Sequence, residues 1–353
     1  MRKRHIFGKL DQVFAETPAV PLSREDRFVF FSDLHLGDGS SRDDFRRNAG
    51  IFTAVLKQYY AENRFRLVLN GDIEELQRFG LSQIRRQWAE VYQLFDEFAA
   101  ASRLFKIIGN HDQELETLHH PSSSPPTLPA LKLDYDGNYI FVFHGHQASL
   151  FMEKFNLLCG LVLKYIANPI GIKNFSYSHD STVRFKTEKQ VYGFSRDRKI
   201  VSLIGHTHRP LFESLSKTDC LKFKIEQLCR DYASAAFNDR EKLAQKIQTY
   251  NAELRYYQTR NRNDADQSSL YTTDPLVPCL FNSGSVIGKN GMTAIEIDRG
   301  QIQLVYWFDR NRSTKYFNFN GFQPEQLNDG DYFRVVLKQE PLDYIFTRIK
   351  LLA

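Results

Sequence analysis

Five short apolar segments along the chain each end in polar residues of the kinds that bind metal ions. The clearest is LIGHTHRP, from Leu203 to Pro210, in which a buried-strand pattern stops at a glycine and two histidines follow. The other four are RFVFFSD, RLVLNGD, RLFKIIGNHD and NYIFVFHGH. Segments with helical apolar spacing separate the first three. The sequence therefore predicts an α/β fold with a largely parallel first sheet.

The polar residues fall at the carboxyl ends of these strands, which is where α/β sheets bind ligands. They are Asp33, His35, Asp72, Asn110, His111, His144, His206 and His208. A set of carboxylates, an amide and imidazoles of this size is too large for one tetrahedral zinc and suits two divalent ions that share a ligand. Asp72 is the expected bridge, because a carboxylate has two oxygens. The mixed donors favour Mn²⁺, with iron or zinc as alternatives.

Composition limits the class of protein and its surroundings. The 353 residues carry a net charge of +5 and are 42% hydrophobic, which allows a large core and suits an anionic substrate or a membrane surface. None of the four cysteines lies in a CxxC pair, and no signal-peptide pattern opens the chain. We therefore expect a cytoplasmic protein, with peripheral membrane contact as an alternative and with nucleic acid disfavoured as a partner.

The remaining segments predict additions to one domain that spans residues 1–353. Residues 1–26 read as a polar lead-in without regular structure, because two prolines interrupt it. Residues 150–199 read as a helical insertion and candidate lid, and residues 211–273 as a charged helical hairpin. After them, LVPCLFNSGSV, MTAIEIDRG and QIQLVYWFD alternate like antiparallel strands and predict a second sheet near the C-terminus.

The strand-end motifs also resemble those of a known superfamily. SDLHL, NGDIEE, IIGNHD, FHGH and GHTHRP, in this order, resemble the blocks of the calcineurin-like metallophosphoesterases, and FNSGSV resembles a further block. The resemblance covers about Phe28 to Trp307. It implies a two-sheet α/β/β/α sandwich with helical insertions. It also implies a hydrolase that cleaves a phosphate ester or pyrophosphate by attack of a hydroxide bridging two metal ions.

The same resemblance implies roles for individual residues. One metal ion would be held by Asp33, His35 and His208, the second by Asn110, His144 and His206, and Asp72 would bridge the two. His111 would donate a proton to the leaving group and Asp112 would orient it. His146 and Arg209 are candidate substrate contacts, since the fourth block reads HGH where many relatives have HGD.

The substrate stays open at this point. The helical insertion between the fourth and fifth blocks resembles that of the UDP-2,3-diacylglucosamine hydrolases, which act on a lipid-linked nucleotide. Those enzymes commonly carry Arg where this chain has His111. A phosphatase acting on a phosphoprotein or small phosphomonoester is the second reading. A nuclease and a non-catalytic scaffold that binds protein partners are two further alternatives.

Overall fold

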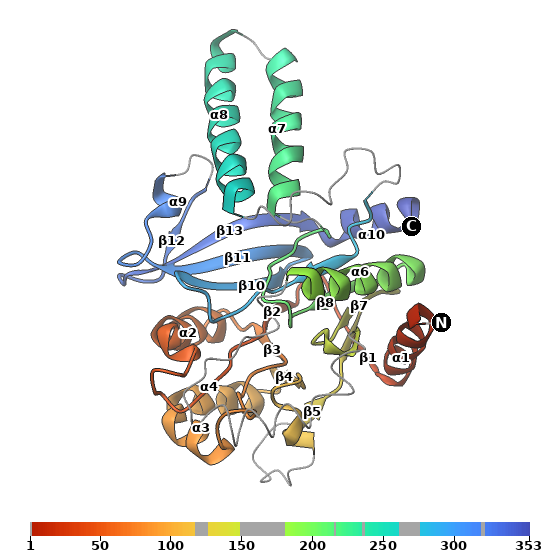
Figure 1. Ribbon diagram of the computed structural model, residues 1–353, viewed down its shortest axis with the longest axis vertical. Helices are drawn as coiled ribbons and strands as arrows, with labels where there is room; N and C mark the ends of the chain where they lie inside the picture. Colours follow the sequence, from red (N-terminus) through yellow and green to blue (C-terminus); the bar gives the residue numbers. More distant parts are fainter. Residues whose placement is uncertain are drawn as a thin grey trace.

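The computed structural model describes residues 2–116, 126–148, 181–214, 217–234, 237–260, 276–318 and 322–353. In this part of the chain two β-sheets pack face to face, and helices cover their outer sides (Figure 1). The protein is therefore an α/β/β/α sandwich, which confirms the predicted fold class.

The larger sheet has eight strands and joins a parallel half to an antiparallel half. β2, β3, β4 and β5 are mutually parallel, and β10, β11, β13 and β12 continue the sheet in antiparallel pairs. Across the sheet the strands are β12 (Glu325–Gln326), β13 (Tyr332–Pro341), β11 (Gln301–Asp309), β10 (Gly291–Asp298), β2 (Arg27–Phe31), β3 (Arg66–Asn70), β4 (Leu104–Ile107) and β5 (Thr127–Leu128).

The smaller sheet has five strands, and its last three are parallel. Across the sheet they are β1 (Ala19–Pro21), β6 (Leu131–Tyr135), β7 (Asn138–Val142), β8 (Val201–Ile204) and β9 (Leu280–Asn282). β7 and β8 are the strands whose carboxyl ends lead into the HGH and GHTHRP motifs.

The central strand β2 shows why these segments are apolar throughout. Phe28 and Phe30 enter the core between the sheets, whereas Val29 and Phe31 face the helices α2 (Ala49–Val55) and α4 (Ala89–Ala100). Successive side chains of a strand point to opposite faces, so a strand covered on both sides carries no polar face. The outer face of the smaller sheet is covered by α1 (Arg2–Glu16) and α6 (Ser181–Arg198). Three further α-helices among the described residues are α3 (Leu81–Gln87), α9 (Lys315–Asn318) and α10 (Leu342–Leu352).

The predicted strands divide between the two sheets in a way that their apolar patterns do not indicate. The first three lie in the larger sheet, but the fourth and fifth, β7 and β8, lie in the smaller one. β10 and β11 are antiparallel as expected, yet they extend the larger sheet instead of forming a separate one near the C-terminus. β10 pairs directly with β2, with Ile295 opposite Phe30, and both side chains enter the core between the sheets. Strand partners depend on such distant contacts, which apolar periodicity does not encode.

The N-terminal segment contradicts the expectation of a lead-in without regular structure. α1 buries Ile6, Phe7 and Leu10 against the smaller sheet, and β1 pairs in parallel with β6. These apolar side chains recur at helical spacing, so the helix gains its stability from burying one face. The two prolines lie beyond α1 and leave its interior intact.

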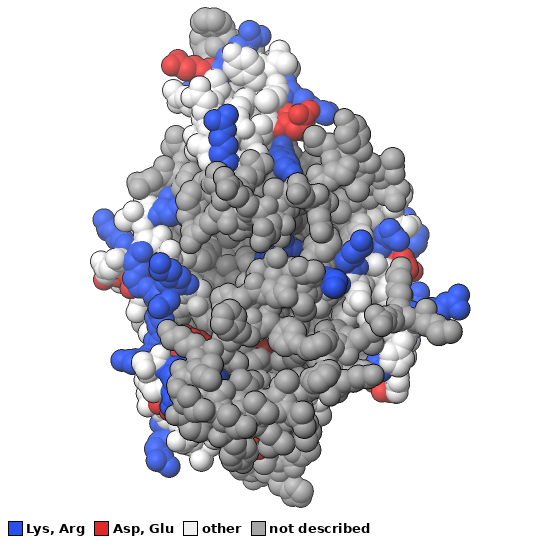
Figure 2. Space-filling view, in the orientation of Figure 1, with Lys and Arg blue, Asp and Glu red and all other residues white. Residues whose placement is uncertain are grey.

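A pair of long helices projects from the body of the molecule (Figure 1). α7 (Lys217–Ser234) and α8 (Phe237–Arg260) lie side by side, with Lys224 Nζ 4.5 Å from the centre of the Tyr250 ring. Lys315 Nζ lies 3.7 Å from Glu253 Oε1 and connects the base of α8 to α9. Lys and Arg side chains as well as Asp and Glu side chains stand on this pair (Figure 2), so its surface is mixed in charge.

The candidate lid is only partly visible. Residues 149–180 lie outside the described residues, and α6 is the described part of this insertion. Among the helices that the structure describes, none combines the length and the apolar character needed to cross a membrane.

Candidate active site

The polar ends of the strands from both sheets meet at one place. Donor atoms within 4.8 Å of one another form three groups, of which two contain an aspartate. These two consist of Asp33, His35 and His208 and of Asp72, His144 and His206, and the third consists of His35, Glu75 and His111. In each aspartate group the aspartate follows a strand of the larger sheet, and at least one histidine follows a strand of the smaller sheet. The two groups therefore lie where the sheets adjoin.

The first group places three potential ligand atoms in close contact. Asp33 Oδ1 lies 3.0 Å from His208 Nε2, and His35 Nε2 lies 3.3 Å from the same nitrogen. His35 Nδ1 is 2.9 Å from Glu75 Oε2, and a carboxylate in this position accepts the Nδ1 proton. The Nε2 lone pair of His35 is then directed toward Asp33 and His208, as in a histidine that binds a metal ion.

The second group is arranged around Asp72. Its Oδ2 lies 3.1 Å from His144 Nε2 and 4.0 Å from His35 Nε2, so this oxygen lies between the two groups. His144 Nδ1 lies 2.8 Å from the backbone oxygen of Asn70 and donates to it, so Nε2 of His144 faces Asp72 and is the nitrogen that a metal ion would bind in place of a proton. The other oxygen of Asp72, Oδ1, accepts a hydrogen bond from His111 N at 2.8 Å.

Several buried polar atoms at this place lack a hydrogen-bond partner. They are Asp33 Oδ1, Asn110 Oδ1 and His144 Nε2. Asp33 Oδ1 and His144 Nε2 lie close to other potential ligand atoms, His208 Nε2 at 3.0 Å and Asp72 Oδ2 at 3.1 Å, but without hydrogen-bond geometry. Leaving a buried polar atom unpaired costs about 1–3 kcal/mol, so three of them together call for a ligand. Carboxylate oxygen, amide oxygen and imidazole nitrogen are donors that divalent Mn, Fe and Zn accept. These residues therefore fit divalent metal ions.

The backbone is strained at the same positions. Asp33, His35, Asp72, His206 and His208 all adopt left-handed conformations, with φ of 55°, 49°, 53°, 64° and 54°. This region costs a residue with a Cβ about 1 kcal/mol or more. Such strain persists only where the surrounding structure fixes it, and it is typical of functional sites.

Two glycines allow the loops to approach the carboxylates. A Cβ on Gly109 would lie 2.2 Å from both the backbone nitrogen and Oδ1 of Asp72. A Cβ on Gly205 would lie 2.5 Å from Ser32 Oγ and 2.7 Å from Asp33 Oδ2. The glycines that precede Asn110 and His206 are therefore required by close packing against the two aspartates.

Glu75 holds two histidines at once. Its Oε1 lies 2.9 Å from His111 Nδ1 and its Oε2 lies 2.9 Å from His35 Nδ1. Burial alone would raise the pKa of Glu75, but the two histidines, His111 foremost, lower that pKa to about 2. Burial alone would lower the pKa of His111, but Glu75 and Asp72 raise it to about 10. The sequence interpretation missed Glu75, although it stands three residues after Asp72 in the block NGDIEE.

The side chain of Asp112 has a different role from the predicted one. Its Oδ2 accepts from Ile73 N at 2.8 Å and its Oδ1 from Gly109 N at 2.6 Å, so it joins two loops of the site. Burial and the nearby charges of Glu74 and Asp72 raise the pKa of Asp112 to about 7. The carboxylate that orients the His111 ring is Glu75 instead, because its oxygen is the one beside Nδ1.

The charges around Asp72 compensate one another in the metal-free protein. Burial would raise the pKa of Asp72, but His144, His111 and His35 hold it well below its usual value. For the imidazole of His144 the signs are reversed: burial would lower its pKa, but Asp72 raises it to about 9. Burial and the neighbouring His144 lower the pKa of His206 to about 3. Without a metal ion, protonated His144 therefore supplies the positive charge beside the Asp72 carboxylate.

The two candidate substrate contacts lie next to the site. The Arg209 guanidinium is paired with Glu188 of α6, to which its Nε donates at 3.2 Å and its Nη2 donates as well. The His146 ring centre lies 5.6 Å from that of His144, and its Nδ1 is buried without a hydrogen-bond partner. Contact of either residue with a substrate stays a prediction.

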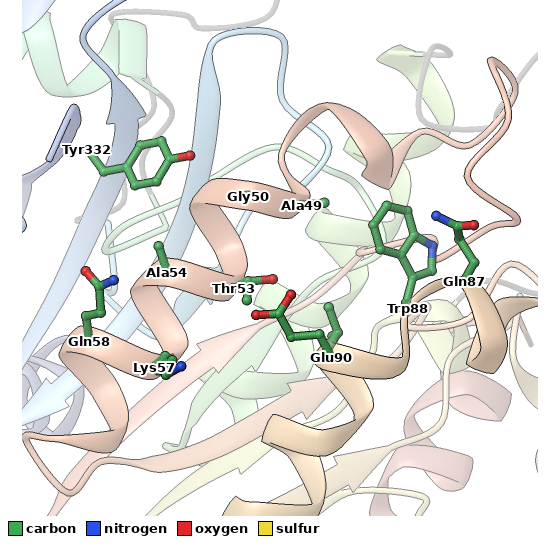
Figure 3. A pocket seen from close by; sticks show the side chains of 11 residues that line it. Ala49, Gly50, Thr53, Ala54, Lys57, Gln58, Gln87, Trp88, Glu90 and Tyr332 are labelled. Atoms are coloured by element: carbon green, nitrogen blue, oxygen red, sulfur yellow. The ribbon is translucent and has the colours of Figure 1, made fainter.

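A surface cavity of about 500 Å³ lies apart from these groups. Its lining comes from α2, the adjoining π-helical turn, α4 and Tyr332, with Trp88 at one end (Figure 3). The Trp88 indole nitrogen donates to the Gly37 oxygen and to Asp43, each at 3.0 Å. None of the predicted site residues lines this cavity, so it is not where the strand-end residues would act.

Comparisons with known proteins identify the family of this chain. Among curated proteins, none matches the chain. A predicted phosphoesterase from Streptococcus pneumoniae TIGR4 shares 10% identity over 80% of this chain and 89% of its own, with a TM-score of 0.29. A mutant of a cold-active protein tyrosine phosphatase shares 13% identity over 83% of this chain and 81% of its own, with a TM-score of 0.35. The sequence profile of the calcineurin-like phosphoesterases matches residues 26–233, which contain all the predicted metal ligands. The chain therefore belongs to the calcineurin-like phosphoesterases and is a hydrolase of phosphate esters.

Proposed function

We propose that this hydrolase cleaves its substrate at a centre of two divalent cations that share Asp72. The observation that carries the proposal is the position of Asp72 Oδ2, which lies 3.1 Å from His144 in one ligand group and 4.0 Å from His35 in the other. The proposed ligands are Asp33, His35 and His208 for one cation and Asn110, His144 and His206 for the other, with Asp72 common to both. Manganese is the expected metal, and iron or zinc would suit the same donors.

Two such cations would neutralise the phosphoryl oxygens and acidify a water molecule at neutral pH. The protein itself supplies the proton for the leaving group. Glu75 fixes the Nδ1 side of the His111 ring, and His111 Nε2 lies 4.0 Å from Asp72 Oδ2, on the side of the proposed centre. Two carboxylates near one imidazole favour its protonated form, so His111 can donate to the departing oxygen. A positioned donor of this kind contributes about 10²–10⁴-fold in rate.

For the substrate, we propose a phosphate ester of a small molecule, a protein or a lipid-linked nucleotide. His111, in place of the Arg common among UDP-2,3-diacylglucosamine hydrolases, supports a phosphomonoester over a lipid-linked pyrophosphate. A nuclease would be expected to have a broad basic face. On the described residues of the face in Figure 2, basic side chains stand in separate groups and acidic ones lie among them.

Metal content and turnover test the proposal together. The purified protein should contain about two equivalents of divalent metal by elemental analysis and should hydrolyse p-nitrophenyl phosphate when Mn²⁺ is added. Chelation should abolish turnover, and Mn²⁺ should restore it. Faster hydrolysis of bis-p-nitrophenyl phosphate would favour a diester or pyrophosphate substrate. A protein that binds no metal and turns over neither ester would be a scaffold, and the proposal would be wrong.

A further inference from the structure

A single buried carboxylate connects α6 to the loop that carries His206 and His208. Glu188 of α6 is 4% exposed, and its Oε1 accepts a hydrogen bond from Thr207 Oγ1 at 2.8 Å. Arg209 donates to both oxygens of the same carboxylate, through Nε at 3.2 Å and through Nη2. Glu188 therefore holds the residues on both sides of His208.

This loop needs support from outside itself. His206 and His208 have φ of 64° and 54°, a conformation that is disfavoured for any residue with a Cβ. Thr207, between them, makes a tight turn in which its backbone nitrogen lies 2.7 Å from Gly205 O. The two histidines, one on each side of Thr207, enter different ligand groups. Contacts that fix Thr207 consequently fix both imidazoles.

The hydroxyl of Thr207 is held from two directions. It donates to Glu188, and it accepts a hydrogen bond from Asn282 Nδ2 at 2.9 Å. The same amide nitrogen donates to Gly205 O at 2.9 Å. Thr207 is 1% exposed and Asn282 is fully buried, so water does not compete for these bonds. A satisfied polar network in such surroundings makes a loop rigid.

α6 is itself a rigid support. Glu188, Val191 and Ser195 lie on one face of the helix, at intervals of three and four residues. Val191 is fully buried against the smaller sheet, and Ser195 Oγ donates to Ser202 Oγ of β8 at 2.7 Å. The helix is thus attached to the strand that leads into His206, and its carboxylate reaches past the end of that strand.

We propose that Glu188 is a positioning residue for both metal ions of the proposed centre. It holds Thr207 and Arg209 so that His206 and His208 keep the separation at which each serves a different cation. The inference rests on the two-metal function proposed above. In this role α6, the described part of the insertion, helps to build the site. Arg209 uses its charge to bind Glu188 instead of a substrate.

Two variants test this role. Glu188→Ala removes the carboxylate, and Thr207→Val removes the hydroxyl while it keeps the shape of the side chain. The readouts are the dissociation constant for Mn²⁺ by calorimetry and kcat for p-nitrophenyl phosphate. Both variants should bind Mn²⁺ about 10–100-fold more weakly, which is the usual effect of losing a group that orients a metal ligand. Excess Mn²⁺ should restore part of kcat. The double variant should lose less than the product of the two single effects, because both remove the same hydrogen bond.

Glu296→Ala is the matched control. Glu296 is another buried carboxylate paired with an arginine, Arg334, and it lies on β10 opposite Val29. Its loss should lower the melting temperature and leave the Mn²⁺ affinity unchanged.

The outcomes separate the two proposals. If both test variants bind Mn²⁺ as tightly as the wild type, or if Glu296→Ala weakens binding equally, the role of Glu188 is refuted and the two-metal function stands. A wild-type protein that binds no Mn²⁺ refutes both. If Glu188→Ala does not fold, Thr207→Val alone decides.

Discussion

Replacing Glu75 with glutamine tests whether one carboxylate can orient two histidines. Glu75 is 4% exposed, and each of its oxygens lies 2.9 Å from an imidazole Nδ1, that of His111 on one side and that of His35 on the other. Glutamine has the same shape but only one acceptor oxygen, and its other terminal atom is a donor. In Glu75→Gln one of the two rings must therefore turn or move its proton to Nε2.

The size of the effect depends on which ring loses its acceptor. If His35 carries its proton on Nε2, it can no longer bind a cation, and the Mn²⁺ affinity should fall about 10–100-fold, or about 1.4–2.7 kcal/mol. If His111 loses its orientation, the metal should stay bound and kcat should fall by about 10²–10⁴-fold. At least one of the two quantities must change.

Calorimetric titration with Mn²⁺ and kcat at saturating Mn²⁺ distinguish the two cases. Glu74→Gln is the matched control, because the neighbouring carboxylate is equally buried but bonds to Lys106 and Tyr92. This control should lower stability and leave the Mn²⁺ affinity intact. A Glu75→Gln protein with wild-type affinity and wild-type kcat would show that Glu75 orients neither ring.

Three further predictions concern Asp72, His111 and two of the cysteines. Asp72→Ala should release both metal ions and abolish turnover, and two retained equivalents by elemental analysis would disprove a shared ligand. His111→Asn should keep its metal and slow turnover by about 10²–10⁴-fold, whereas unchanged kinetics would remove His111 from the reaction. Native alkylation followed by peptide mass mapping should label the exposed Cys229 and spare Cys279, whose pKa burial raises to about 12; labelled Cys279 in folded protein would contradict this.

The strands were predictable from sequence and their partners were not. An apolar run such as RFVFF identifies a strand covered on both faces, because both of its faces need apolar side chains. Which strand lies beside it depends on contacts across the whole chain, such as Ile295 opposite Phe30. The N-terminal helix was missed for a related reason. Its apolar face is sparse, and it is stable because Ile6 and Leu10 meet a sheet formed much later in the sequence.

The site shows the same division. The potential metal ligands could be predicted because each ends an apolar strand, and the ends of such strands are brought together by the fold. Glu75 lay within the motif NGDIEE, but the motif does not distinguish it from the adjacent Glu74, and its contact with His35 spans 40 positions of sequence. The sequence did not indicate that Glu188 is buried at the site, because a glutamate on a helix is normally exposed to solvent. Its importance comes from burial against Thr207, which only the folded chain shows.

Each ligand group takes side chains from both sheets, and this has a consequence for how the protein matures. Neither sheet alone supplies a complete set of the proposed metal ligands, so a folding intermediate with undocked sheets would bind cations weakly. The proposed metal ions should bind in the last step of folding. On heating, they should dissociate when the two sheets separate. A metal-sensitive dye and circular dichroism, recorded in one thermal scan, should then report a single transition.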